Sequence, residues 1–278
     1  MAESSLPAAT RPGRVSLAVE DPYAVSSFYR DVVGLEQLDR TADTATLGIG
    51  ETPLLELVES DHGPRTDSQA GLYHVAFRYP SRTALGSALN RIEALYQLDG
   101  ATDHGVTRSL YLTDPAGNGV ELYADRPRST WPTEDGEVRM RTDPLDLDAL
   151  RAAGESGTDA PEGTRIGHVH LEVTDLASAT AFYSAGLGLP VTREIGDMAR
   201  FFATDGYHHH LGVTTARDRT DPATGRGIDW FEFVVPDREA IEAAEARFEE
   251  MDVSVADRDG GIAVADPDGI GVWLSVRN

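Results

Sequence analysis

Four stretches of the chain repeat one pattern of hydrophobic and polar positions. Each begins with a short segment in which apolar and polar residues alternate, passes through a turn that contains Asp or Pro, and enters a segment with apolar residues at helical spacing. Further β-like segments follow each predicted helix. Because alternation predicts strands and helical spacing predicts helices, the chain is predicted to contain four β-α-β-β-β modules. Their first strands begin at Arg14, His74, His168 and Trp230.

The modules are of two kinds, which alternate along the chain. The first and third carry a Phe-Tyr pair on the predicted helix, with the tyrosines at Tyr29 and Tyr183, and then a Gly-Leu stop. The second and fourth close on an Asp-Pro-x-Gly turn, which starts at Asp114 and Asp266 and leads into an alternating strand. A tight turn before an alternating strand is typical of a half-buried hairpin arm.

The order of the modules predicts two domains and a linker. Residues 12–125 hold the first two modules, and residues 165–278 hold the last two. Residues 126–164 between them are rich in Pro, Gly and acidic residues, with one short helix predicted over 145–153 after a start signal at Asp143-Pro. Because this connection is longer than a tight link requires, the two halves can assemble in more than one way.

Charge narrows the range of partners. The 278 residues include 47 acidic and 24 basic ones, for a net charge of −23, and every basic residue is Arg. A surface this negative repels phosphates and acidic lipids, so neither nucleic acid nor a membrane is expected as a partner. Because the acidic excess is spread along the whole chain, it indicates adaptation to a salt-rich cytosol, where salt screens self-repulsion. We therefore expect a halophilic protein.

Two absences in the sequence exclude further classes. The chain has no Cys, which excludes disulfides, thiolate metal sites and a Cys nucleophile. The first 14 residues are polar and rich in Pro and Ala, and no later stretch is long and apolar enough to span a bilayer. A cytoplasmic location is therefore expected.

The repeated module, the Phe-Tyr helix and the closing strand Asp114-Pro-Ala-Gly-Asn-Gly-Val-Glu-Leu-Tyr resemble the vicinal oxygen chelate superfamily, which includes glyoxalases, bleomycin and fosfomycin resistance proteins and extradiol dioxygenases. Four modules in one chain are similar to the type I extradiol dioxygenases of the catechol 2,3-dioxygenase type. The resemblance covers almost everything from Arg14 to Val276 except the linker. It implies an α+β fold in which the four βαβββ modules form two open eight-stranded barrels.

The resemblance also implies where a metal binds. In that family the ligands come from the first strand of each of two paired modules and from a last strand. Alignment places His74 and Glu121 of module two at these positions, together with His168 of module three. Pairing neighbouring modules instead brings in Arg14, or two Trp residues at positions 230 and 273. The resemblance therefore implies a metal-binding barrel from modules two and three, and a metal-free barrel from modules one and four in which the two Trp side chains fill the cavity.

Three further residues match catalytic positions of extradiol enzymes. His209, in the segment Tyr-His-His-His-Leu-Gly, matches the acid/base histidine of the odd module's last strand. Tyr111, three residues before the Asp-Pro turn, is expected to donate a hydrogen bond to the developing anion. His104, in a His-Gly-Val context, is expected to orient the substrate oxygen or to close the pocket.

Other histidines near these positions stay open as alternatives. His170 lies on the same strand face as His168, because strand side chains alternate with a period of two. The same alternation would place His208 and His210 opposite to His209, so the choice among the three depends on the strand frame. All of them remain candidates for a second contact or an alternative ligand.

Together the resemblance implies an Fe(II)-dependent dioxygenase that cleaves a catechol-type diol with O2 outside the diol, giving a ring-opened semialdehyde in aromatic compound degradation. Two His and one carboxylate suit Fe(II), and Mn(II) can use the same ligands. Alternatives are a hydroquinone substrate, another metal-dependent reaction of this family (glyoxalase, lyase or isomerase), and a non-catalytic small-molecule binding protein. The expected partners are an aromatic diol and O2. The oligomeric state stays open, since edge strands of open barrels often pair into homo-oligomers.

Overall fold

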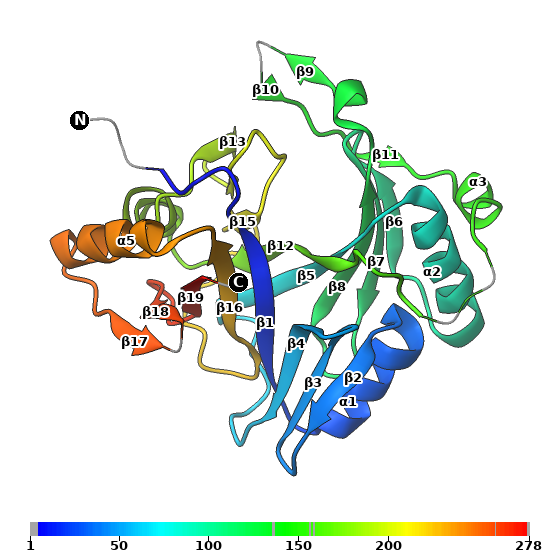
Figure 1. The fold of residues 1–278 in the computed structure, drawn as a ribbon, viewed down its shortest axis with the longest axis horizontal. Coiled ribbons are helices and arrows are strands. Elements are labelled where there is room, and N and C mark those ends of the chain that lie inside the picture. Colours follow the sequence, from blue (N-terminus) through cyan, green and yellow to red (C-terminus); the bar gives the residue numbers. More distant parts are fainter. Residues whose placement is uncertain (1–4, 135–136, 156, 158, 259, 277–278) are drawn as a thin grey trace. The chain divides into compact units, whose positions relative to one another are not determined.

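The four modules are visible in the computed structural model, which describes residues 5–134, 137–155, 157, 159–258 and 260–276 (Figure 1). The first consists of β1 (Arg11–Val19), α1 (Pro22–Phe28), a π-helix (Tyr29–Val33), β2 (Glu36–Arg40), β3 (Thr44–Ile49) and β4 (Thr52–Glu59). The second consists of β5 (Gly71–Tyr79), α2 (Arg82–Leu95), β6 (Gly100–Asp103), β7 (Thr107–Thr113) and β8 (Gly119–Asp125).

The second half repeats this plan. The third module consists of β12 (Arg165–Glu172), α4 (Leu176–Thr180), a π-helix (Ala181–Gly186), β13 (Val191–Ile195), β14 (Ala199–Phe202) and β15 (Leu211–Thr214). The fourth consists of β16 (Gly227–Val235), α5 (Arg238–Glu250), β17 (Ala256–Arg258), β18 (Gly261–Ala265) and β19 (Gly271–Val276). The prediction of four β-α-β-β-β modules is confirmed.

The strands form two mixed sheets. An eight-stranded sheet takes its strands from the first and fourth modules, and a nine-stranded sheet takes its strands from the second and third modules and from β11 (Asp143–Pro144). The predicted α+β fold is thus confirmed. The sheets are not closed into the expected barrels, and β11, which pairs with β6, gives one of them a ninth strand.

The chain divides into two compact units, which are described separately below. One comprises residues 1–16, 62–73 and 168–278, and the other residues 17–61 and 74–167. Each unit thus collects most of one predicted domain. The pairing of modules into functional domains stays a prediction.

The long helices form where the spacing of apolar residues predicts them. In α2 the side chains of Leu85, Leu89 and Ile92 are buried, and the hydroxyl of Ser81 caps the helix by accepting a hydrogen bond from the Ala84 N–H. In α5 the buried residues Ile241, Ala244 and Phe248 follow the same spacing, after a cap by Asp237. Each helix covers its own module's strands with one apolar face.

The two sequence motifs contact each other within each unit. Tyr29 stands at the junction of α1 and its π-helix, and its hydroxyl donates to the Asp114 carboxylate at 2.9 Å. Tyr183, near the start of the other π-helix, donates to Asp266 at 2.7 Å. The other oxygen of each carboxylate accepts backbone N–H groups of its own turn. The Phe-Tyr motif of an odd module therefore fastens the Asp-Pro turn of the next module.

This contact makes stability depend on pH. Burial raises the pKa of Asp266 to about 6, and hydrogen bonds from Tyr183 and from the backbone only partly offset that effect. Because an unfolded carboxyl titrates near 3.9, the folded state holds a proton that the unfolded state has lost between these two pKa values. Relative to Asp266→Asn, the free energy of unfolding of the parent should fall by about 3 kcal/mol as the pH rises from 4 to 7. Urea unfolding of the parent and of Asp266→Asn between pH 4 and 7 measures this change in the free energy of unfolding. The exposed control Asp229→Asn should show no such trend, and a pH-independent difference for Asp266→Asn would contradict the prediction.

The predicted linker is largely structured. Its helix, α3, covers Leu147–Arg151, within the predicted range 145–153, but the N-cap is Asp146 rather than the predicted signal at Asp143-Pro, which forms β11 instead. The side chain of Asp146 accepts from the Ala149 N–H, whereas Asp143 is engaged in the ladder with β6. α3 lies beside α2 (Figure 1), held by an ion pair of 2.6 Å between Arg151 and Glu93.

Three shorter elements complete the described chain. A 3-10 turn covers Arg128–Thr130, and β9 (Thr133–Glu134) pairs with β10 (Glu137–Val138) in a separate two-stranded ladder. Among the described residues, every helix is too short or too polar to cross a membrane.

Candidate metal centre

Two adjacent strands of the second module bring together an imidazole and a carboxylate. β5 and β8 run parallel, with Ala76 opposite Glu121, so that His74 and Glu121 share one face of the sheet. The His74 Nε2 lies 3.0 Å from the Glu121 Oε2, and both side chains are buried. A buried carboxylate is stable only with a partner of this kind. The pair therefore supplies two of the predicted ligands at one point of the sheet.

A tyrosine from the next strand adjoins this pair. Tyr111 on β7 lies directly opposite Glu121 on β8, and its ring centre is 6.0 Å from that of His74. The Tyr111 hydroxyl is 2.8 Å from the Nε2 of His104, whose Nδ1 is 2.7 Å from the backbone carbonyl of Arg141. Since a carbonyl only accepts, Nδ1 carries the proton, and in neutral His104 the Nε2 accepts the Tyr111 hydroxyl proton. His104 therefore positions Tyr111, a contact that the sequence did not predict.

In the third module, His168 and His170 stand on β12 as predicted, whereas the three consecutive histidines do not lie on a strand. They end the loop between β14 and β15, after a turn in which Asp205 and Gly206 adopt positive φ angles of 54° and 59°. Alternation does not hold in such a loop. The strand prediction placed His208 and His209 on opposite faces. In the structure they lie together instead, with their Nδ1 atoms 2.9 Å apart and both rings buried.

The rings of the third module form one cluster around His209. Its centre lies 4.2 Å from that of His168, 6.3 Å from that of His170 and 5.1 Å from that of Phe201. The ring of His170 occupies the space where a Cβ on Gly212 of β15 would lie, at 2.7 Å, which explains the glycine. The predicted ligand and the predicted acid/base residue of this module are therefore neighbours.

The rings of Tyr207 and His210 adjoin this cluster through His208. Tyr207 lies between His208 and His210, with ring centres 4.0 and 4.9 Å away. The amide of His210 donates to the carbonyl of Phe202 at 2.7 Å, which fixes the loop to the end of β14. His210 is therefore part of the loop's framework rather than of the His168–His209 contact.

The equivalent positions of the fourth module contain no metal-binding set. Trp230 on β16 and Trp273 on β19 have the same register as His74 and Glu121, and their rings meet edge to face at 5.6 Å. The guanidinium carbon of Arg258 lies 4.2 and 4.4 Å from the two ring centres, and that of Arg14 lies 5.6 and 4.9 Å away. Stacked Arg and Trp side chains thus fill this position, as predicted for the two Trp side chains, and the metal-free barrel stays a prediction.

His74 and Glu121, both buried in one unit, offer one imidazole nitrogen and one carboxylate oxygen, and His168, buried in the other unit, offers a second imidazole nitrogen. Two imidazole nitrogens and one carboxylate oxygen are a donor set for a divalent first-row metal that keeps coordination positions open. The chemistry of the donors therefore fits the predicted metal.

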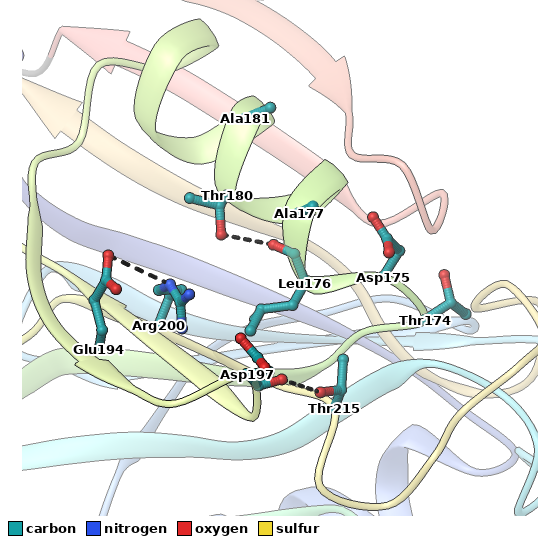
Figure 2. A pocket seen from close by; sticks show the side chains of 10 residues that line it. All are labelled: Thr174, Asp175, Leu176, Ala177, Thr180, Ala181, Glu194, Asp197, Arg200 and Thr215. Carbon is teal, nitrogen blue, oxygen red and sulfur yellow. Dashed lines mark hydrogen bonds and ion pairs between the residues drawn. The ribbon is translucent and has the colours of Figure 1, made fainter.

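A separate pocket of about 700 Å³ lies beside α4 and has no His in its lining (Figure 2). Three acidic residues line it, together with Arg200, whose Nη1 donates to the backbone carbonyls of Gly196 and Ala199 and whose Nε lies 3.6 Å from Glu194. None of the predicted site residues lines this pocket.

Comparison with known proteins connects this geometry to a family. The family model described as Glyoxalase/Bleomycin resistance protein/Dioxygenase superfamily matches residues 11–122 and 165–274. The chain is 35% identical to catechol-2,3-dioxygenase of Bacillus subtilis strain 168 over 268 residues, which is 93% of this chain and 94% of that protein. It is 41% identical to biphenyl-2,3-diol 1,2-dioxygenase 2 of Rhodococcus globerulus over 66 residues, 22% of this chain and 33% of that protein.

Solved structures share the fold at lower identity. A candidate dioxygenase of Bacillus subtilis subsp. subtilis strain 168 has a TM-score of 0.65 and 16% identity, covering 99% of this chain and 86% of that one. Glyoxalase I from Zea mays has a TM-score of 0.59 and 19% identity, covering 96% and 92%. At these identities the likeness concerns the fold alone.

Proposed function

Since the chain belongs to the Glyoxalase/Bleomycin resistance protein/Dioxygenase superfamily, we propose that it is an extradiol dioxygenase, which cleaves a catechol-type diol with O2 to a ring-opened semialdehyde. The observation that carries the proposal is the buried His74–Glu121 pair with Tyr111 opposite, in a chain 35% identical to a catechol-2,3-dioxygenase along most of its length. The relationship to that enzyme supports a dioxygenase-type reaction and a metal cofactor.

His74, Glu121 and His168 would hold the metal, Fe(II) by preference and Mn(II) as the alternative. When bound, the metal supplies Lewis acidity toward the diol oxygens and redox capacity toward O2. Glu121 would give the set a single negative charge, so that a bound divalent metal would leave net positive charge to favour an ionised diol. Burial of the three side chains would limit the access of water to the metal.

His209 would take a proton from one diol hydroxyl and return it later. Its Nδ1 is engaged by His208, so Nε2 is the atom that would exchange the proton. Imidazole suits this role because its pKa lies near neutrality. The contact with the His168 ring, at 4.2 Å between centres, holds this base beside a predicted metal ligand.

Tyr111 and His104 would act on the substrate as a hydrogen-bonded pair. While His104 is neutral, Tyr111 donates to it, and the tyrosine oxygen can accept a hydrogen bond from a diol hydroxyl. The His104 Nδ1 donates to the Arg141 carbonyl and holds the ring in place, so His104 is a positioning residue for the Tyr111 hydroxyl.

The test is aerobic mixing with catechol after anaerobic loading with Fe(II), in a buffer of high salt. We expect a yellow semialdehyde to form with uptake of one O2 per diol. Cleavage of hydroquinone but not of catechol would show that the substrate is a hydroquinone instead of a catechol. Metal retention without cleavage of either diol would reject the dioxygenase, and failure to retain any divalent metal would favour a non-catalytic binding protein.

A further inference from the structure

Three arginines of the first-described unit surround one buried carboxylate at the end of β12. Glu172 has a side chain 1% exposed, and its oxygens lie 3.2 Å from Arg65, 3.1 Å from Arg217 and 2.9 Å from Arg219. We call Arg65, Arg217 and Arg219 the arginine cluster. Sequence reasoning did not detect it, because its members come from two loops that are distant in the chain. The one sequence feature that could have indicated it is Glu172 itself, an acidic residue in the strand β12, whose side chain is buried.

The arginine cluster carries more positive charge than Glu172 neutralises. Three guanidinium groups lie around Glu172, and Asp67 also acts on Arg65, so a surplus of one positive charge remains in a chain whose net charge is −23. Burial lowers the pKa of Arg65, as do Arg219 and Arg217, while Glu172 and Asp67 oppose them. A local positive surplus in an acidic protein is the kind of feature that attracts an anion.

The three arginines differ in what they are able to contact. Arg219 is 6% exposed and also donates to the backbone carbonyl of Asp67, so it fastens the segment 62–73 to β12. Arg217 has a side chain 56% exposed and meets Glu172 through its Nε, so this contact does not engage its two terminal nitrogens. Arg217 is therefore the member placed to meet a ligand.

The arginine cluster lies on the same strand face as the predicted site. Residues 168, 170 and 172 of β12 alternate with a period of two, so Glu172 shares a face with His168 and His170. Tyr73 connects the two regions, because its ring centre lies 5.3 Å from that of His170 and 5.1 Å from the guanidinium carbon of Arg217. Tyr73 is 39% exposed, so this series of side-chain contacts extends from His170 to the surface.

We propose that the arginine cluster, through Arg217, recognises a carboxylate on a side chain of the diol's ring, so that the preferred substrates are anionic catechols. The proposal rests on the proposed function. An anionic substrate approaching this acidic protein is repelled by its overall field, and the positive surplus around Arg217 provides a local attraction beside the site. A planar guanidinium binds a carboxylate through two parallel hydrogen bonds, which suits the terminal nitrogens of Arg217.

The experiment compares 3,4-dihydroxyphenylacetate with its neutral methyl ester, which has the same ring and nearly the same shape. One charge-assisted contact should make KM of the acid about tenfold lower than that of the ester. In Arg217→Gln the ratio of the two KM values should collapse toward one, and Arg217→Lys, which keeps the charge but not the fork, should restore part of it. Arg238→Gln, which removes an exposed arginine of α5, is the matched control and should keep the parent's ratio.

Calorimetric binding of both compounds to the metal-loaded protein without O2 distinguishes carboxylate recognition from the dioxygenase reaction. If the acid binds more tightly than the ester but neither is cleaved, the carboxylate preference stands and the dioxygenase proposal fails. If both are cleaved with equal KM, or if Arg217→Gln weakens acid and ester equally, the arginine cluster has only a structural role and the inference is overturned.

Discussion

Glu121→Gln should abolish iron retention and ring cleavage together. The substitution keeps the shape of the side chain but removes the anionic ligand of the predicted set, and the Glu121 Oε2 lies 3.0 Å from His74 in a buried position. Because loss of an outer-shell partner alone costs a metal site about 10- to 100-fold in affinity, loss of a charged ligand should cost at least about a hundredfold. Metal content after gel filtration, and semialdehyde formation with catechol, measure the two effects.

Stability measurements distinguish loss of metal binding in Glu121→Gln from a general structural effect of the substitution. The exposed strand-end acid Glu59 provides the matched control Glu59→Gln, which should retain metal and activity. Adding Fe(II) without O2 should raise the melting temperature of the parent and of the control, because a metal that binds only the folded state stabilises it. Glu121→Gln should show no such rise. A variant that still gained stability from Fe(II) would remove Glu121 from the metal site.

The modules were predictable from the sequence because their determinants are local. Alternation and helical spacing act within a few residues, and the buried stripes of α2 and α5 follow directly from them. Comparing two copies of one module was equally informative. The shared register of His74 with Glu121, and of Trp230 with Trp273, bears out that alignment of the strands.

What could not be predicted depends on contacts between distant residues or on loop conformation. The strand frame assumed for His208 and His209 failed because the turn at Asp205 and Gly206 ends the alternation before them. Likewise, the partner of His104 is a backbone carbonyl of Arg141, a group that every residue has and that no sequence pattern marks. The same limit applied to Asp143, whose Pro neighbour is typical of a helix start although the pair forms a strand edge.

His209→Gln should keep the metal and slow turnover by about 10²- to 10⁴-fold, the usual range for loss of a general acid/base. The His209 ring is buried against His168 and bonded through Nδ1 to His208, and glutamine preserves much of the side-chain volume and a polar end without an ionisable group. Anaerobic metal content and the melting temperature with Fe(II) should therefore match those of the parent. The kcat of the variant on catechol should also lose the dependence on pH that titration of an imidazole gives the parent.

His208 provides the matched control for this prediction. His208→Phe keeps a ring of similar size but removes the Nδ1 partner of His209 and not the base itself, so kcat should fall less than in His209→Gln while its dependence on pH remains. Loss of iron from His209→Gln would instead make His209 a ligand, since its ring lies within 4.2 Å of His168. If His208→Phe were the more severe variant and His209→Gln kept the parent's pH profile, the acid/base role would pass to His208, because the two rings share one hydrogen bond and only one of them is required to exchange the proton.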